Sequence, residues 1–217
     1  MSTRRLADGT SVPTGLTSPG VPTTPDDVAR AITAARQGDA DALGLVWQAH
    51  QPLVLRYLRG RGAQDAADVA SQVWIDAARN LHRFEGDATD FRRWLFTIAR
   101  RRLVDARRRA ARHDVETLHT VVDRAAAPGA DVVFDQRDAL TRALALVKRL
   151  PDPMRDAVLL RFVADLSVED AAAVMGVRAG HVRVLTHRGL ARLERLLADA
   201  PTDAVTLPVP PTINGPA

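Results

Sequence analysis

The spacing of apolar residues along the chain predicts helices separated by short polar breaks. Val69, Val73, Ala77 and Leu81 recur every four residues, which places them on one buried stripe of a helix. Patterns of this kind predict helices over about residues 25–37, 39–58, 65–80, 91–112, 136–150 and 153–163. Pro52 falls inside the second of these helices and predicts a kink or break there. The sequence therefore predicts an all-α fold.

The stretch from Leu166 to Leu197 predicts two helices joined by a tight turn. Ser167 is a favourable N-cap with Asp170 three residues later, and Gly176 suits a left-handed residue that ends a helix. The second helix has a mostly basic outer face, which carries Arg183, Val184, His187, Arg188, Arg192 and Arg195. This arrangement is typical of a helix-turn-helix that enters the major groove of DNA. The alternative is an ordinary amphipathic helix pair whose arginines are only solvated.

Residues 92–112 hold nine arginines and a single acid, Asp105. The arginines are Arg92, Arg93, Arg100, Arg101, Arg102, Arg107, Arg108, Arg109 and Arg112. Because like charges at this density repel one another, a phosphate backbone is the partner that the segment favours. Trp94 and Phe96 lie within the run and suit stacking on unpaired bases. The alternative is a solvated basic helix whose aromatic side chains belong to the core.

The composition removes several classes of function. The 217 residues include no cysteine, which excludes disulfides and thiolate metal sites. The six histidines form no i, i+4 pair, and we find neither a glycine-rich phosphate loop nor a nucleophile elbow. We therefore expect no enzyme, no metal and no cofactor. Because there is no apolar run of about 18 residues and no signal-peptide pattern, we also expect a soluble, cytoplasmic protein without membrane insertion.

Breaks in the helical pattern predict two modules joined by a tether. The expected order is a disordered leader (1–24), a first module (25–112), a flexible linker (113–135), a second module (136–199) and a disordered tail (200–217). Pro128 and Gly129 mark the linker. A relaxed linker of this length spans only about 25–30 Å. We therefore expect the modules to tumble semi-independently in the free protein, with a larger partner holding them apart on DNA.

Four features in this order resemble the extracytoplasmic-function (ECF) branch of the sigma-70 family, the bacterial transcription initiation factors. They are an acidic helix over residues 65–74, a basic aromatic helix over residues 91–100, a short linker, and Leu150-Pro151 leading into the helix-turn-helix. The similarity covers about residues 26–197. It implies two small helical domains, sigma region 2 and sigma region 4, and a protein without catalytic chemistry of its own.

The resemblance also implies three binding surfaces. In this family the acidic helix binds the clamp helices of the polymerase β′ subunit, and here that surface holds Asp65, Asp68 and Gln72. The basic helix and the loop before it melt and capture the −10 element, which assigns Gly86, Asp87, Thr89, Asp90, Trp94, Arg100, Arg101, Arg102 and Arg107. The second module binds the β flap and reads the −35 element through a helix-turn-helix at residues 167–188, which assigns His181, Arg183, Val184, His187 and Arg188. The implied partners are core RNA polymerase, promoter DNA and an anti-sigma factor.

The sequence departs from the family pattern at a few positions. Ala67 and Gln72 stand where the family commonly has Glu, Arg101 replaces a common Asn, and Leu185 stands where an Arg is frequent. These departures affect the expected strength of the polymerase contact and the expected promoter sequence more than the expected function as an initiation factor. The alternative function is a stand-alone helix-turn-helix transcriptional regulator whose first module dimerises or senses a signal. The basic, tryptophan-bearing helix argues against that alternative, because a sensor domain has no use for its charge.

Overall fold

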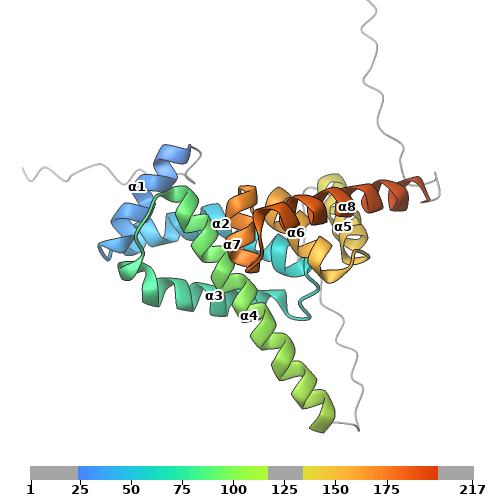
Figure 1. Cartoon of the computed structure of the whole chain (residues 1–217). Helices are drawn as coiled ribbons and strands as arrows, with labels where there is room; N and C mark the ends of the chain where they lie inside the picture. The colour runs from blue at the N-terminus through green and yellow to red at the C-terminus, as the bar shows by residue number, and fades with distance from the viewer. Residues whose placement is uncertain (1–23, 117–133, 200–217) are drawn as a thin grey trace, which may run out of the picture.

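The computed structural model describes residues 24–116 and 134–199, which consist of helices and the turns between them (Figure 1). The helical elements are α1 (Pro25–Arg36), α2 (Ala40–Gly60), α3 (Ala66–Asn80), the short 3-10 turn η1 (Leu81–Arg83), α4 (Ala88–Glu116), α5 (Phe134–Lys148), α6 (Asp152–Phe162), α7 (Val168–Met175) and α8 (Ala179–Ala198). Because no strand occurs within these two ranges, the predicted all-α fold is confirmed. Nearly all of the predicted leader, linker and tail lie outside the described residues. None of the described helices has the length and apolar character that crossing a bilayer requires.

The first two helices begin at residues whose side chains cap them. The Thr24 side chain accepts a backbone hydrogen bond in the first turn of α1, and Asp39 does the same for α2. Each side chain satisfies an N–H group that the first turn of a helix leaves without a partner. Helix α2 then continues through Pro52 as one helix of 21 residues, so this proline does not break it.

Helix α3 buries the stripe that its spacing predicts. Val69, Val73, Ala77 and Leu81 are all buried, while Asp65 and Asp68 lie on the exposed side of the helix start. Helix α3 packs against α2 and α4 in the N-terminal module. In Figure 1 the second half of α4 projects beyond the other helices, and Arg108, Arg109 and Arg112 on it are exposed.

The aromatic residues of α4 divide between the core and the surface. Phe96 is 0% exposed and packs edge-on against Tyr57, with the ring centroids 5.4 Å apart. Trp94 is half-buried and lies tilted against Phe84 at 5.3 Å. Positions two apart on a helix differ by about 200° in direction, so these two rings cannot share a face. The prediction that Phe96 stacks on bases is therefore wrong, whereas Trp94 keeps part of its ring accessible.

The C-terminal module contains the helix-turn-helix at the expected place. Ser167 caps α7 by accepting the N–H of Asp170 at 3.0 Å. Gly176 ends the helix with a φ of 70°, the left-handed conformation that suits glycine. Helix α8 follows, with Val182 and Leu185 buried against the module. The predicted cap and turn of this motif are thus confirmed.

The two modules pack against each other, which the sequence did not indicate. Helix α4 contacts α7, and α2 contacts both α5 and α6 (Figure 1). At Gly60, the last residue of α2, an added Cβ would lie 2.7 Å from Leu159 Cδ2 of α6. The buried side chains of both modules form one continuous hydrophobic cluster. The expectation of two semi-independent modules is therefore wrong for this arrangement, in which the modules share a core.

His50 is a buried titratable group in that core and gives a testable pH dependence. Its Nδ1 lies 2.9 Å from the carbonyl oxygen of Val46, and its ring packs edge-on against Phe91. Burial is the largest influence and lowers the pKa of His50, and the nearby Arg92 charge lowers it further, against the opposing effect of the Val46 carbonyl. Well above about pH 6.5, the ordinary pKa of histidine, the ring is neutral in both folded and unfolded chains, so it adds no pH dependence there.

As the pH falls below that value, the unfolded chain takes up a proton on His50 that the native protein resists, so the free energy of unfolding should decrease. A His50→Leu variant should therefore show a smaller loss of stability between about pH 7 and about pH 5 than the parent. Urea unfolding at the two pH values measures the difference. Gln48→Leu, at an exposed position of the same helix, is the matched control and should keep the parental dependence, because it removes no titratable group. Equal pH dependence in all three proteins would contradict the assignment.

Candidate nucleic-acid and polymerase interfaces

Most arginines of the basic helix α4 already have carboxylate partners. Four of them pair with acids of the C-terminal module: Arg92 with Asp165 at 2.9 Å, Arg93 with Asp170 at 3.2 Å, Arg100 with Asp156 at 2.9 Å and Arg107 with Asp152 at 3.0 Å. Arg102 pairs with Asp76 of α3. Within the part of the chain that the structure describes, Arg101, Arg108, Arg109 and Arg112 form no ion pair. Of the arginines predicted to contact the −10 element, Arg101 alone is therefore unpaired in this arrangement.

The pair of Asp76 and Arg102 ties α3 to α4. Two nitrogens of the Arg102 guanidinium donate to the two carboxylate oxygens of Asp76. These hydrogen bonds hold the pKa of Asp76 below its ordinary value. Bidentate pairing of this kind orients both side chains. Arg102 thus holds two helices of the first module together, whatever else it binds.

The loop before α4 closes on itself through two carboxylates. Asp87 Oδ1 accepts the N–H groups of Thr89 and Asp90 at 2.8 and 2.9 Å, and Asp90 Oδ2 accepts the N–H of Asp87 at 3.3 Å. This reciprocal pattern is that of a capping box. Gly86 has a φ of 137°, and a Cβ there would lie 2.6 Å from the Cβ of Asp90. These four predicted −10 residues therefore share one compact loop, and three of them are needed for its shape.

A groove of about 650 Å³ lies beside this loop. The end of α3, the loop and α4 form its walls, and Ala173 of α7 closes one edge. Asp90, Trp94 and Arg101 line it together, so it unites three of the predicted −10 residues. A partly exposed indole beside an unpaired guanidinium suits the stacking of a base and the binding of its phosphate.

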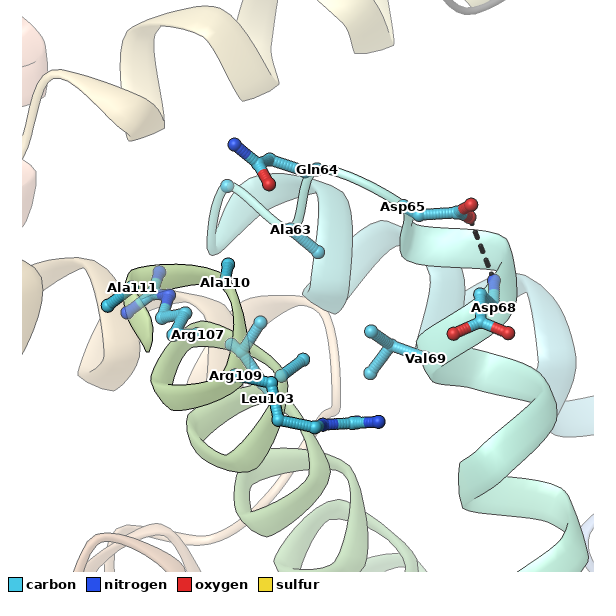
Figure 2. A pocket seen from close by; sticks show the side chains of 12 residues that line it. Ala63, Gln64, Asp65, Asp68, Val69, Leu103, Arg107, Arg109, Ala110 and Ala111 are labelled. Atoms are coloured by element: carbon cyan, nitrogen blue, oxygen red, sulfur yellow. Dashed lines mark hydrogen bonds between the residues drawn. The ribbon is translucent and has the colours of Figure 1, made fainter. Parts of the chain in front are cut away.

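A second groove, of about 490 Å³, separates the start of α3 from the second half of α4 (Figure 2). Asp65 and Asp68 form one wall, and Arg107 and Arg109 lie on the other. Small apolar side chains form the floor between these walls. Two of the three predicted polymerase residues therefore line one mixed-charge groove, whereas Gln72 lies further along α3 and outside it.

The predicted −35 residues share the outer face of α8. They are His181, Arg183, Val184, His187 and Arg188, and all five are exposed. Leu185 is buried, as its position at the edge of the apolar stripe indicates. Arg183 donates to Glu169 of α7 at 2.8 Å, and both side chains remain largely exposed. This face of the helix-turn-helix is therefore accessible, in contrast to the arginine face of α4.

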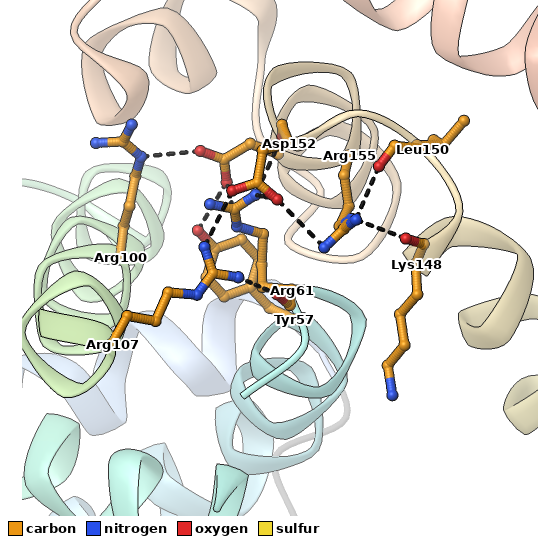
Figure 3. Close-up of polar contacts among 9 residues, drawn as sticks. Tyr57, Arg61, Arg100, Arg107, Lys148, Leu150, Asp152 and Arg155 are labelled. Atoms are coloured by element: carbon orange, nitrogen blue, oxygen red, sulfur yellow. Dashed lines mark hydrogen bonds and ion pairs between the residues drawn. The ribbon is translucent and has the colours of Figure 1, made fainter. Parts of the chain in front are cut away.

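Sequence reasoning missed the residues that join the two modules. Asp156 of α6 is 2% exposed and accepts hydrogen bonds from Tyr57 Oη at 2.8 Å and Arg100 Nε at 2.9 Å. Arg61 Nε lies 3.3 Å from the same carboxylate, close enough for an ion pair but without hydrogen-bond alignment. Burial, and then the charge of Asp156, raises the pKa of Tyr57 well above its ordinary value, so the phenol stays a donor. Figure 3 shows the side chains of Tyr57, Arg61, Arg100 and Arg107 meeting beside Asp152 at this contact.

The neighbouring acid, Asp152, extends this network to the rim of the contact. Arg107 donates to its carboxylate, while Arg61 donates to its backbone carbonyl at 3.1 Å (Figure 3). Partial burial opposes ionisation, but the charges of Arg61, Arg107 and Arg155 outweigh it and lower the pKa of Asp152. Across residues 24–116 and 134–199 the structure gathers no trio of acids and histidines suited to a metal ion. In this arrangement the charged groups at the contact pair with one another.

Known sequences show the family of the chain. Two family models match it, sigma-70 region 2 over residues 46–113 and sigma-70 region 4 over residues 140–193. The ECF RNA polymerase sigma factor SigD of Mycobacterium tuberculosis is 34% identical, over 75% of this chain and 80% of that protein. The chain therefore belongs to the sigma-70 family of RNA polymerase sigma factors, and within it to the ECF group. The predicted family is confirmed.

Solved structures show the same fold. CnrH, in complex with the cytosolic domain of CnrY, aligns with a TM-score of 0.58 at 24% identity, over 81% of this chain and 100% of that one. The sigma factor RpoE of Bartonella quintana, in complex with the anti-sigma factor NepR, aligns with a TM-score of 0.53 at 20% identity, over 80% of this chain and 96% of that one. At these identities the likeness concerns the fold alone.

Proposed function

We propose that this sigma factor binds core RNA polymerase and places it on promoters, with region 2 opening the −10 element and region 4 reading the −35 element. The observation that carries the proposal is the pair of basic surfaces on two modules of one sigma-family chain. One is the groove of Trp94 and Arg101 on α4, and the other is the outer face of α8. The polymerase supplies the catalysis, so the chain needs no active site and works in the cytoplasm.

In region 2, the −10 strand binds along α4 and the loop before it. A base stacks on Trp94 while Arg101 holds the adjacent phosphate, and Gly86, Asp87, Thr89 and Asp90 form the loop against which the strand lies. Stacking of a base on an aromatic side chain contributes about 1–3 kcal/mol. Arg100, Arg102 and Arg107 add charge to this path once their carboxylate partners release them.

In region 4, α8 enters the major groove at the −35 element. Arg183, Val184, His187 and Arg188 lie on its exposed face, and His181 lies near its start. Arg183 donates to the exposed Glu169, a pair weak enough for a base edge or phosphate to displace. A bidentate contact of an arginine with guanine discriminates by about 1–3 kcal/mol against other bases.

The polymerase contact falls on α3 and the groove beside it. Asp65 and Asp68 present two exposed carboxylates to a basic helix of the β′ clamp, and Gln72 extends the contact along α3. The β flap binds region 4. The RpoE structure contains an anti-sigma factor, and its shared fold supports an anti-sigma partner for this chain too.

Reversing one charge at the β′ contact tests this assignment. Asp68→Arg should change stability by no more than about 0.5 kcal/mol, because the side chain is exposed. It should weaken binding to core polymerase by at least about tenfold, because like charges then face each other. Fluorescence anisotropy with purified core polymerase measures the affinity. Asp41→Arg is the matched control, since Asp41 is also an exposed acid in the first turn of its helix.

Run-off transcription with purified core polymerase tests the function as a whole. We expect a stable complex with core and initiation from promoter fragments that depends on the added chain. The alternative function, a stand-alone regulator, requires tight binding to a palindromic duplex and no complex with core. Observation of that pair of results would reject the sigma-factor assignment.

A further inference from the structure

Val184 is an apolar residue at the centre of the otherwise polar outer face of α8. It is 45% exposed. His181 and His187 lie three positions before and after it, and Arg188 lies four positions after it, so all three are its neighbours on the helix surface. These neighbours are exposed too. The central position of the face assigned to the −35 element therefore belongs to a side chain that has no hydrogen-bonding group.

The packing of α8 does not account for this valine. At about 100° per residue, Val184 lies about 160° around the helix from Val182 and about 140° from Gly189, and both of those residues are buried. Val184 therefore projects from the side of α8 that is opposite the core. Valine also has a lower intrinsic helix propensity than alanine, leucine or arginine. Neither burial nor helix propensity favours a valine at this position.

The surface beside Val184 is open to an approaching base. Gly180 lies four positions before it, on the same side of the helix, and a Cβ added there would have no atom within 4 Å. The valine methyl groups are therefore accessible from the N-terminal end of α8. In a helix-turn-helix the residues at that end of the second helix contact the edges of the bases.

One group on the major-groove edges of the base pairs matches an exposed apolar side chain. It is the C5-methyl of thymine, because the other groups there are hydrogen-bond donors and acceptors. A C5-methyl also occurs on 5-methylcytosine, where it stands beside the N4–H₂ donor, whereas in thymine it stands beside the O4 acceptor. Arg183 and Arg188 flank Val184 and can only donate hydrogen bonds. They therefore favour thymine over 5-methylcytosine.

We propose that Val184 determines specificity for one thymine in the −35 element, by packing its methyl groups against the C5-methyl of that base. This inference rests on the proposed function of α8 as the reader of the −35 element, and it adds the identity of one base. The contact is apolar, so its strength follows from the area that it removes from water. Loss of one buried methyl group weakens binding by about fourfold, which corresponds to about 0.8 kcal/mol.

The first test identifies the base position by selection from a random duplex library. The complex of the full chain with core polymerase captures the duplexes, which are then sequenced. We expect the parent to select thymine at one −35 position, and Val184→Ala to lower that preference by about fourfold while keeping the other positions. Leu190→Ala is the matched control and should keep the parental selection, because Leu190 is an exposed apolar residue of the same helix about 120° away from Val184.

The second test removes the methyl group from the DNA instead of the protein. Deoxyuridine in place of the selected thymidine lacks only the C5-methyl and should weaken binding to the parent complex by about fourfold. Val184→Ala should bind the two duplexes equally, because each change alone already removes the contact. A duplex with 5-methylcytosine paired to guanine at this position keeps the methyl group, and it should bind the parent complex less tightly than the thymine duplex. Fluorescence anisotropy measures all of these affinities.

The salt dependence of binding separates this contact from the charged ones. Val184→Ala should leave the slope of log K against log salt concentration as in the parent, because methyl groups release no counterions from DNA. The variant should also remain folded, since alanine is the better helix former at an exposed position. A changed slope would show that the variant displaces α8 from the groove, and would overturn the proposal.

The outcomes separate this contact from the function on which it rests. Equal binding of the thymine and deoxyuridine duplexes by the parent complex would overturn the proposal, as would an equal loss with deoxyuridine in the parent and in Val184→Ala. Binding of the 5-methylcytosine duplex as tight as that of the thymine duplex would overturn the assignment of thymine. Failure of the proposed function would appear elsewhere, as the absence of a complex with core polymerase and of run-off product for the parent and the variants alike.

Discussion

Replacement of Asp156 by alanine is expected to lower the free energy of unfolding by about 3–5 kcal/mol, as is typical when one partner of a buried ion pair is removed. Its carboxylate receives hydrogen bonds from Tyr57 and Arg100 and lies 3.3 Å from Arg61 Nε. Arg61 is 4% exposed, so the substitution leaves a buried cation with only the longer contact to Asp152. The buried hydroxyl of Tyr57 also loses its acceptor.

The size of this loss has an upper limit set by the contact between the modules. If the modules separate, water again solvates Arg61 and Tyr57. The loss therefore cannot exceed the free energy by which the packed modules are more stable than the separated ones. Urea unfolding followed by far-ultraviolet circular dichroism and by a fluorescence energy-transfer pair, attached at Ser71→Cys on α3 and Glu194→Cys on α8 of this cysteine-free chain, distinguishes the two cases. Coincident transitions indicate global unfolding, whereas an earlier fall in energy transfer indicates separation of the modules first.

A conservative variant serves as the control. Asp156→Asn keeps an acceptor for Tyr57 but removes the charge that Arg61 and Arg100 require, so its loss should fall between those of the parent and the alanine variant. A loss below about 1 kcal/mol for Asp156→Ala, with no change in energy transfer, would contradict the role of this carboxylate at the centre of the contact.

Features that depend on near neighbours in the chain were predictable. The caps at Thr24, Asp39 and Ser167 and the turn at Gly176 each involve residues within one helical turn, so the sequence contains all of their partners. The burial of one face of α3 was predictable because its apolar residues recur every four positions. The five exposed residues of α8 were predictable for that reason too, because one buried stripe determines which face is left for solvent.

The contact between the modules was not predictable, because its partners lie far apart in the chain. Tyr57 and Asp156 are separated by 99 positions, and Arg92 and Asp165 by 73. A helical pattern indicates that such residues lie on polar faces, but it does not pair one polar face with another. The arginines of α4 were therefore predicted as free for DNA, whereas four of them are held by region 4 in this arrangement. Their roles at the promoter remain predictions.

Phe96 and Trp94 lie two positions apart on α4, the first in the core and the second at its edge. Their alanine variants should therefore differ, with the larger loss of stability for Phe96→Ala and the larger loss of DNA binding for Trp94→Ala. Phe96→Ala should lower the free energy of unfolding by about 3–5 kcal/mol, because it leaves a cavity beneath the fully buried Tyr57. Trp94→Ala should cost about 1–2 kcal/mol of stability, since its half-buried ring packs on Phe84 and Phe91 at the edge of the core.

Binding of oligothymidylate should show the reverse order. Trp94→Ala removes the stacking surface and should weaken binding by about 1–3 kcal/mol, which is roughly ten- to a hundredfold. Phe96→Ala, measured at a temperature at which it remains folded, should bind as tightly as the parent, because its fully buried ring offers no surface to a base. Anisotropy titrations and urea unfolding on the same preparations give both quantities. Weakened binding by Phe96→Ala with unchanged stability would restore Phe96 as a base-stacking residue and contradict its place in the core.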